Sequence, residues 1–178
     1  TFDKSQGVTA RDTFGVDLTS SINVTDADKV NVNSAGKYIV KYTVRDVAGN
    51  EITVDRVVKV YGLPTIKATD EVILKVGETF EELKGVTAKD SFNVDLQIDV
   101  KDADKVDVQN AGKYPVKYTV RDDAGNVVTK ERVVKVYGTP VIDGTDEVIL
   151  KVGGTFDESK GVTAEDSLGE DLKSSIKV

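Results

Sequence analysis

Hydrophobic and polar residues alternate along several short stretches of this chain of 178 residues. In the stretch KYPVKYTVR at residues 113–121, one face carries only large apolar side chains: Tyr114, Val116, Tyr118 and Val120. A period of two predicts a β-strand with one buried and one solvated face. Comparable stretches occupy residues 37–45, 57–61, 71–76 and 133–137. Because no window keeps a helical period, the pattern predicts an all-β protein.

Whole segments of this pattern recur at a spacing of about 76 residues. AGKY begins at Ala35 and again at Ala111, and AGN begins at Ala48 and again at Ala124. A unit of this length suits a whole small domain better than a solenoid repeat. We therefore expect a first repeat at residues 1–62 that lacks its first strand, a complete repeat at 63–138, and the beginning of a third at 139–178.

A polar motif, RD-x-AGN, closes the alternating stretch in each of the first two repeats. Its Asp comes first and its Gly fourth, which favours a type I turn followed by a left-handed glycine. The motif therefore predicts a hairpin loop closed by a glycine bulge. The turn residues are Asp46, Gly49 and Asn50, with Asp122, Gly125 and Asn126 in the second repeat. The alternative is a ligand site formed by the Arg-Asp pairs Arg45–Asp46 and Arg121–Asp122.

Short strands separated by turn signals at this spacing predict tandem immunoglobulin-like antiparallel β-sandwiches. The segments between repeats, 60–71 and 136–147, are short and hold one proline each. Such links restrict the motion of neighbouring domains and predict a semi-rigid array. We expect Tyr61 and Tyr137, which stand near the end of each repeat in the sequence VYG, to pack at these junctions.

The composition narrows the available chemistry. Asp and Glu outnumber Lys and Arg by 31 to 24, which gives a formal net charge of −7 and argues against a nucleic-acid partner. His and Cys are absent, so the most common general base and the thiolate nucleophile are both missing. We therefore expect no enzyme activity in these residues. No apolar run approaches the roughly 20 residues that span a bilayer, so we expect no membrane insertion of this segment.

Aspartates in the polar turns leave calcium as the one candidate cofactor. The ion takes about six to eight oxygen ligands, many of them carboxylates. The candidate ligands are Asp12, Asp17, Asp90 and Asp95. However, the chain has no D-x-D-x-D-G loop, and a lysine directly follows each of its two DAD segments. The competing interpretation is a set of solvated acidic turns without a cofactor.

The ordered set of motifs is similar to a known family. GVTA-x-D, DL-x-x-x-I-x-V, AGKY-x-VKYTVRD-x-AGN and R-VVKVYG together resemble the bacterial immunoglobulin-like domains repeated in Gram-positive surface proteins. Domains of the same kind are appended to some pesticidal crystal proteins. The resemblance implies an extracellular location, at the cell surface or cell wall, and no catalytic residues. One turn departs from the family pattern, because Phe14, Phe92 and Leu168 stand where the family is often acidic. This departure argues against a cation at that turn.

The pattern and the resemblance lead to the hypothesis of a non-catalytic structural spacer, or stalk, whose partners are neighbouring Ig-like repeats of the same chain. Two alternatives remain open: an adhesin module that binds a host protein or glycan, and an accessory domain of a large secreted enzyme or toxin. The sequence EVILKV, found at 71–76 and again at 147–152, adds a further hypothesis. The second copy could pair with the exposed edge of the first repeat in a neighbouring chain.

Overall fold

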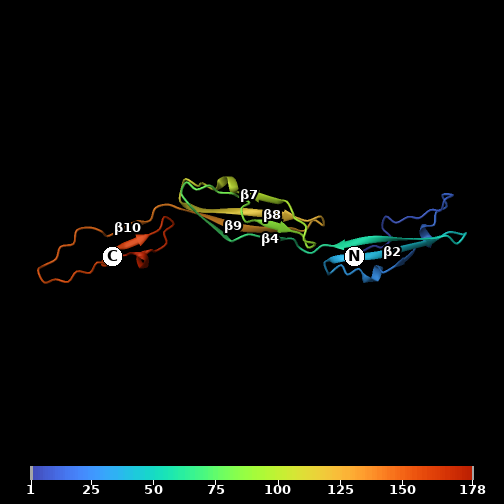
Figure 1. Cartoon of the computed structure of the whole chain (residues 1–178), viewed down its shortest axis with the longest axis horizontal. Helices are drawn as coiled ribbons and strands as arrows, with labels where there is room; N and C mark the ends of the chain where they lie inside the picture. The colour runs from blue at the N-terminus through green and yellow to red at the C-terminus, as the bar shows by residue number, and fades with distance from the viewer. Residues whose placement is uncertain (1, 178) are drawn as a thin grey trace. The chain divides into compact units, whose positions relative to one another are not determined.

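The computed structural model describes residues 2–177. The chain forms two compact units, which are Thr1–Thr65 with Lys89–Leu96 and Arg121–Val127, and Ile66–Ala88 with Gln97–Val120 and Val128–Val178. The described residues form strands and short 3₁₀ turns, without an α-helix (Figure 1). No helix among them is long and apolar enough to cross a membrane. The prediction of an all-β protein is therefore confirmed.

The first repeat is built on a three-stranded antiparallel sheet in the order β1-β2-β3. Its strands are β1 (Asn23–Thr25), β2 (Gly36–Arg45) and β3 (Glu51–Val60). The 3₁₀ turns η1 (Thr19–Ser21) and η2 (Ala27–Lys29) lie on either side of β1 in the sequence. Strands β2 and β3 pair over their whole length, and Tyr38, Val40, Tyr42 and Val44 give β2 an apolar face. Val40 and Tyr42 on β2 are buried there.

The second repeat has two sheets. One pairs β4 (Thr65–Lys67) with β6 (Thr87–Lys89), and the other has the order β5-β9-β8-β7. The strands of the larger sheet are β5 (Glu71–Lys75), β7 (Ile98–Lys101), β8 (Gly112–Arg121) and β9 (Val127–Tyr137). A 3₁₀ turn, η3 (Ala103–Lys105), follows β7. The predicted alternation along β8 is confirmed, since Val116, Tyr118 and Val120 are buried, whereas Lys117 is exposed and Thr119 partly exposed.

The core of the second repeat lies between these sheets. Val86, next to β6, and Tyr118 and Val134 of the larger sheet belong to one buried cluster. Partly buried side chains of β4 and β5, including Ile66, pack against it. Two layers of strands around one apolar core form the β-sandwich that the sequence predicted.

Strand β5 departs from a purely antiparallel arrangement. It runs parallel to β9, with Glu71 opposite Val133 and Lys75 opposite Tyr137. Only three residues separate β4 from β5, and across them the chain passes from the smaller sheet to the larger one. A period of two marks a strand but does not state its direction, so the alternating sequence could not reveal this pairing.

The third repeat is represented by β10 (Val141–Asp143), β11 (Thr163–Glu165) and a 3₁₀ turn, η4 (Lys173–Ser175). Strands β10 and β11 pair antiparallel. The EVILKV segment at 147–152 is not a strand here, although the same sequence forms β5. The reason is physical: β5 is held by hydrogen bonds to β9, and no strand lies beside 147–152 in the part of the chain that the structure describes.

Candidate functional site

One five-residue turn, which begins with aspartate, occurs at five places in the described chain. In each turn the fourth amide donates to the Asp carbonyl oxygen, and the Asp amide donates to the fifth carbonyl oxygen, at 2.9–3.1 Å. The Asp Oδ1 atom also accepts the fifth amide at 2.8–3.0 Å. The turns span residues 12–16, 46–50, 90–94, 122–126 and 166–170. The two RD-x-AGN turns thus belong to a larger set of turns, and each repeat contains at least one of them.

The geometry of the RD-x-AGN turns uses their polar groups locally. Gly49 and Gly125 both have a φ of 88°, the positive value expected at this position. The carboxylate of Asp122, which is only 5% exposed, accepts from the Ala124 amide at 3.0 Å and from the Asn126 side chain at 2.8 Å. Most of the acceptor capacity of this carboxylate is therefore used within its own turn.

The two arginines of the motif have different partners. Arg45 Nη2 lies 2.9 Å from Glu51 Oε2 across the hairpin, while Arg121 Nη1 donates to the Gly125 carbonyl oxygen at 3.3 Å. Each arginine is thus engaged within its own hairpin by a partner other than the aspartate that follows it.

The calcium candidates are likewise engaged in local structure. Asp12 and Asp90 are the first residues of two of the five turns. Asp17 Oδ1 accepts from the Thr19 amide at 2.8 Å, and Asp95 Oδ1 lies 2.7 Å from Lys89 Nζ. Across residues 2–177 there is no cluster of three or more carboxylates placed to hold a metal ion. The arrangement is that of capped, acidic turns.

The turn carboxylates are expected to make the hairpins acid-sensitive. Burial alone would raise the pKa of Asp122, but hydrogen bonds from the Asn126 side chain and from the turn amides hold that pKa below its ordinary value. A lowered folded pKa stabilises the hairpin above the ordinary pKa, and this contribution is lost as the pH falls through the lowered value. We therefore predict that the hairpin opens in acid. Asp122→Asn should remove this loss of stability at low pH and should weaken the hairpin at neutral pH.

A carboxyl chemical-shift titration by NMR, with amide hydrogen exchange at residues 121–127, measures both effects. Asp104→Asn is the matched control, because Asp104 is an exposed aspartate outside the five turns. A titration of Asp122 at or above the ordinary aspartate value contradicts this prediction.

A cluster around Tyr61 follows the end of β3, within the first compact unit. The Tyr61 and Phe92 rings meet edge to face, with centroids 4.8 Å apart and planes at 85°. Lys37 Nζ lies 5.6 Å from the centroid of the Phe92 ring, a cation–π distance. The Tyr61 hydroxyl donates to Asp123 Oδ2 at 3.1 Å. The expectation that Tyr61 packs at a junction is confirmed, and Phe92, at the turn where the family is often acidic, is its partner.

Gly62 completes this cluster through its backbone. Its amide donates to Ser91 Oγ at 3.0 Å, and its carbonyl oxygen accepts from Asn126 Nδ2 at 3.4 Å. A Cβ atom at this position would lie 3.3 Å from the Ala35 Cβ and 3.5 Å from the Ser91 Cβ. A side chain at the glycine of VYG would therefore crowd Ala35, and a turn of the second repeat contributes directly to the end of the first.

The same contact recurs within the second compact unit. The Gly138 amide donates to Ser167 Oγ at 2.7 Å. A Cβ on Gly138 would lie 3.4 Å from the Ser167 Cβ and 3.7 Å from the Ala111 Cβ. Lys113 Nζ also lies 3.7 Å from Glu170 Oε1. The sequence reasoning missed both serines, although each stands directly after the aspartate of a turn at the repeat spacing.

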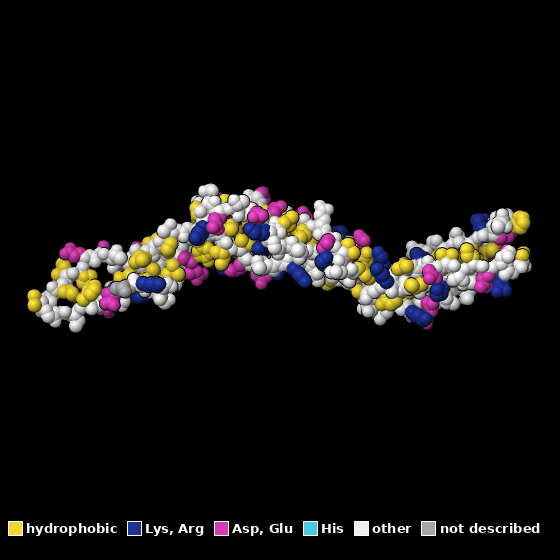
Figure 2. All heavy atoms as spheres, viewed as in Figure 1, with side chains coloured by type: hydrophobic (Ala, Val, Ile, Leu, Met, Phe, Trp, Pro, Cys, Tyr) yellow, Lys and Arg dark blue, Asp and Glu magenta, His cyan; other side chains and the backbone are white. Residues whose placement is uncertain are grey.

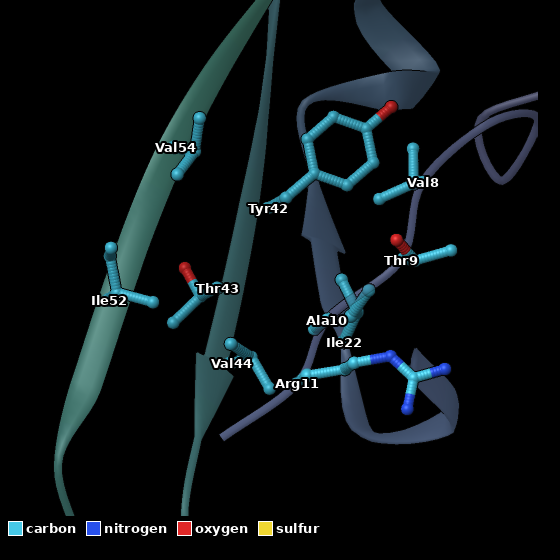
Figure 3. A pocket seen from close by; sticks show the side chains of 10 residues that line it. All are labelled: Val8, Thr9, Ala10, Arg11, Ile22, Tyr42, Thr43, Val44, Ile52 and Val54. Carbon is cyan, nitrogen blue, oxygen red and sulfur yellow. The ribbon is translucent and has the colours of Figure 1, made fainter. Parts of the chain in front are cut away.

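The first repeat also contains an open cavity of about 260 Å³. Figure 3 shows it between residues 8–11 and strands β2 and β3, with Tyr42 and Val8 on one side and Ile52 and Val54 on the other. Its lining is mainly aliphatic, with few polar groups that could orient a ligand. In the second repeat Ile66 and Ala68 pack against the corresponding core.

Two known proteins are similar in sequence to this chain over nearly its whole length. The chain is 34% identical over 185 residues to pesticidal crystal protein Cry22Aa of Bacillus thuringiensis, an alignment that covers 99% of the chain and 25% of that protein. It is 25% identical over 181 residues to an uncharacterized 81.3 kDa protein of Acholeplasma phage L2, covering 95% of the chain and 24% of that protein. The chain thus spans about a quarter of the length of these relatives.

Two solved structures are similar to part of the chain. The lipoprotein BT2262 of Bacteroides thetaiotaomicron is 26% identical over 43% of the chain and 38% of that protein, with a TM-score of 0.33. The CBM51-2 and INT domains of Clostridium perfringens ZmpB, in complex with GlcNAc, are 22% identical over 57% of the chain and 26% of that structure, with a TM-score of 0.38.

One protein-family model matches most of this chain. The model described as "Bacterial surface protein, Ig-like domain" matches residues 1–60 and 64–136, which is most of the chain. This match assigns the same family that the ordered motifs and the β-sandwich of the second repeat indicate. The chain belongs to the family of Ig-like domains of bacterial surface proteins.

Proposed function

We propose that this chain is a non-catalytic spacer: tandem Ig-like repeats of an extracellular cell-surface protein, each held against the next by the same junction contacts. The observation that carries the proposal is the glycine-to-serine hydrogen bond, made by Gly62 and Ser91 and again by Gly138 and Ser167. A contact that recurs at both junctions serves the array rather than one individual ligand.

The energetics of the first junction support a restricted hinge. A net hydrogen bond contributes about 1 kcal/mol, and an aromatic pair such as Tyr61 and Phe92 adds about 0.5–1.5 kcal/mol beyond its buried area. Because about 1.4 kcal/mol changes an equilibrium tenfold, these contacts together favour the closed junction by one to two orders of magnitude. The short, proline-containing link acts in the same direction.

The surface is compatible with a soluble extracellular spacer. On the face shown in Figure 2, Lys and Arg are interspersed with Asp and Glu, and no large patch carries a single sign. Cross-strand pairs such as Lys41 with Asp55, at 3.0 Å, belong to this pattern. Mixed charges with a net negative balance keep a protein soluble and disfavour nonspecific association.

Pulsed electron–electron double resonance tests whether the motion of the two repeats about the junction is restricted. The chain has no cysteine, so Asp28→Cys and Asp104→Cys place one spin label in each of the first two repeats. We predict a narrow distance distribution that broadens when Ser91→Ala and Phe92→Ala remove the junction contacts. Ser20→Ala, at an exposed serine outside the junction, is the control and should leave the width unchanged. A distribution that is already broad, and that the junction variants leave unchanged, contradicts the proposal.

One observation favours a second function, as the accessory segment of a large secreted toxin-like protein. Nearly the whole chain aligns with a quarter of Cry22Aa at 34% identity. Under this proposal the repeats position another domain of the same protein, instead of forming a stalk attached to the cell wall. The parent gene decides between the two, because a toxin domain supports the accessory role and a wall-sorting or layer-anchoring segment supports the stalk.

A further inference from the structure

The parallel strands β5 and β9 connect the two ends of the second repeat. The chain that enters this repeat reaches β5 after only β4 and three further residues, and β9 ends at Tyr137, where the chain leaves the repeat. In the parallel register, Glu71 lies opposite Val133 and Lys75 lies opposite Tyr137. The entering chain is therefore attached at one end of this pair of strands, and the leaving chain is attached at the other end.

Tension along the chain loads this pair of strands in shear. A pull on the entering chain draws β5 toward its Glu71 end, and a pull on the leaving chain draws β9 toward its Tyr137 end. The hydrogen bonds between parallel strands run across this direction, so all of them carry the load together. A pull on both strands from the same end would instead open the bonds one after another, and each bond would carry the whole load in turn.

Contacts at both ends of β5 lengthen this connection to β9. At one end the Val133 amide donates to the Asp70 carbonyl oxygen at 2.9 Å. At the other end the Val76 amide donates to the Tyr137 carbonyl oxygen at 2.8 Å. Three side-chain contacts join the same two segments: Glu71 with Lys135 at 2.6 Å, Asp70 with Lys130 at 2.9 Å, and Thr69 with Arg132 at 3.1 Å. Segment 69–76 is therefore fastened to β9 along its whole length.

Both strands are also held against the core, which opposes sliding of one strand past the other. Val134 and Val136 on β9 are fully buried, and β9 pairs along its other edge with β8. On β5, Val72 and Leu74 pack against the same core. Strand β4, which the load reaches before β5, has only three residues and pairs with β6. The pair of β5 and β9 is therefore the longer of the two connections that tension must break.

We propose that the pair of β5 and β9 is the load-bearing element of this repeat, which extends the proposed spacer role to a spacer that resists tension. Forced unfolding is governed by the unfolding rate rather than by equilibrium stability. The shear arrangement slows unfolding only when the force acts along the chain, between the two ends of the repeat. The repeat is therefore strong along the chain and weak when the same two strands are peeled apart, and this dependence on direction distinguishes a load-bearing pair from a merely stable domain.

Single-molecule force spectroscopy of the full chain in two directions tests the proposal. The chain has no cysteine, and Leu63, Ala124 and Thr139 are exposed, so each can carry a handle as a cysteine. Handles at Leu63→Cys and Thr139→Cys load the pair in shear and should release on the order of 200 Å of chain on unfolding. Handles at Leu63→Cys and Ala124→Cys, in the hairpin before β9, peel the strands from one end. We expect a severalfold higher unfolding force in shear, and equal forces in the two directions overturn the proposal.

Two proline substitutions provide an independent measurement. Val76→Pro removes the amide that donates to Tyr137, at a side chain that is 41% exposed. Successive amides of a strand point to opposite edges, so the Ile73 amide faces away from β9 in this register. Ile73→Pro is therefore the matched control, because it removes no bond between the strands.

At constant force, Val76→Pro should unfold in shear roughly fivefold faster than Ile73→Pro, as expected for one lost hydrogen bond. Peeling should change little, because Val76 lies at the far end of the pair. Release of an unchanged length of chain shows that each variant repeat was folded. Equal rates in shear for the two folded variants contradict the proposal. Because the force measurement reports on one repeat alone, such a failure is distinct from free motion at the junctions, which the spin labels detect.

Discussion

Replacing Tyr118 with alanine is expected to unfold the second repeat. The Tyr118 side chain is fully buried in the core, and its hydroxyl donates to the Glu82 carbonyl oxygen at 2.8 Å. Truncating a buried aromatic side chain costs about 3–5 kcal/mol. A domain has only about 5–15 kcal/mol of stability, and a small one lies near the lower limit. Hydrogen exchange followed by mass spectrometry should show protection lost across residues 63–138.

Two variants serve as controls for this result. Tyr118→Phe keeps the ring and removes only the hydrogen bond, so it should cost about 1 kcal/mol and leave the repeat folded. Tyr42→Ala removes the equivalent residue of the first repeat, whose hydroxyl donates to the Lys4 carbonyl oxygen at 2.8 Å. Its effect should be strongest in residues 1–62. If Tyr118→Ala leaves protection of the second repeat intact, the assignment of this core is wrong.

Gly125→Val is expected to destabilise the second repeat by about 2 kcal/mol, because a left-handed conformation costs an ordinary residue roughly 1–2 kcal/mol and a β-branched one more. Gly125 has a φ of 88° in the hairpin between β8 and β9. The penalty comes from the backbone rather than from crowding, since the nearest atom to a new Cβ is Arg121 Nη1 at 3.7 Å. Guanidinium unfolding monitored by circular dichroism, with hydrogen exchange at β8 and β9, measures the loss.

The chain itself supplies the control for this substitution. Asn93 occupies the same fourth position in the turn at 90–94, with a φ of 66°. Asparagine therefore tolerates this conformation in this fold, and Gly125→Asn should cost clearly less than Gly125→Val. Equal losses for both variants would show that the glycine is needed for another reason than its positive φ.

Much of the fold could be predicted because it depends on short-range patterns. The alternation around Tyr118 identifies β8, and the spacing of Asp46 and Gly49 identifies the hairpin that follows β2. Both features are encoded within a few residues. The repeat spacing extended these predictions from one domain to the next.

The rest depends on contacts between segments far apart in the sequence. The parallel direction of β5 and the bond from Gly62 to Ser91 are set by tertiary packing, which local propensity does not contain. The sequence TDEVILKVG makes the point directly: it includes strand β5 at 69–77 and forms no strand at 145–153. Identical residues adopt different structures because, within residues 2–177, only one copy has a neighbouring strand.

The turns show how a motif that resembles a site can be part of the architecture. Asp122 is buried by its own turn, and Asn126 of the same turn contacts the Gly62 carbonyl oxygen. The motif therefore connects the hairpin of one repeat to the end of the preceding one. Its polar residues form hydrogen bonds within the turn and at the junction.

Residual dipolar couplings measured on the full chain test the central proposal of a spacer with restricted junctions most directly. Couplings from the first repeat and from the second repeat each define an alignment tensor. We predict tensors of similar magnitude and orientation on both sides of Gly62, as expected for repeats that tumble together. Tensors of clearly different magnitude would show independent motion of the two repeats and would contradict the spacer.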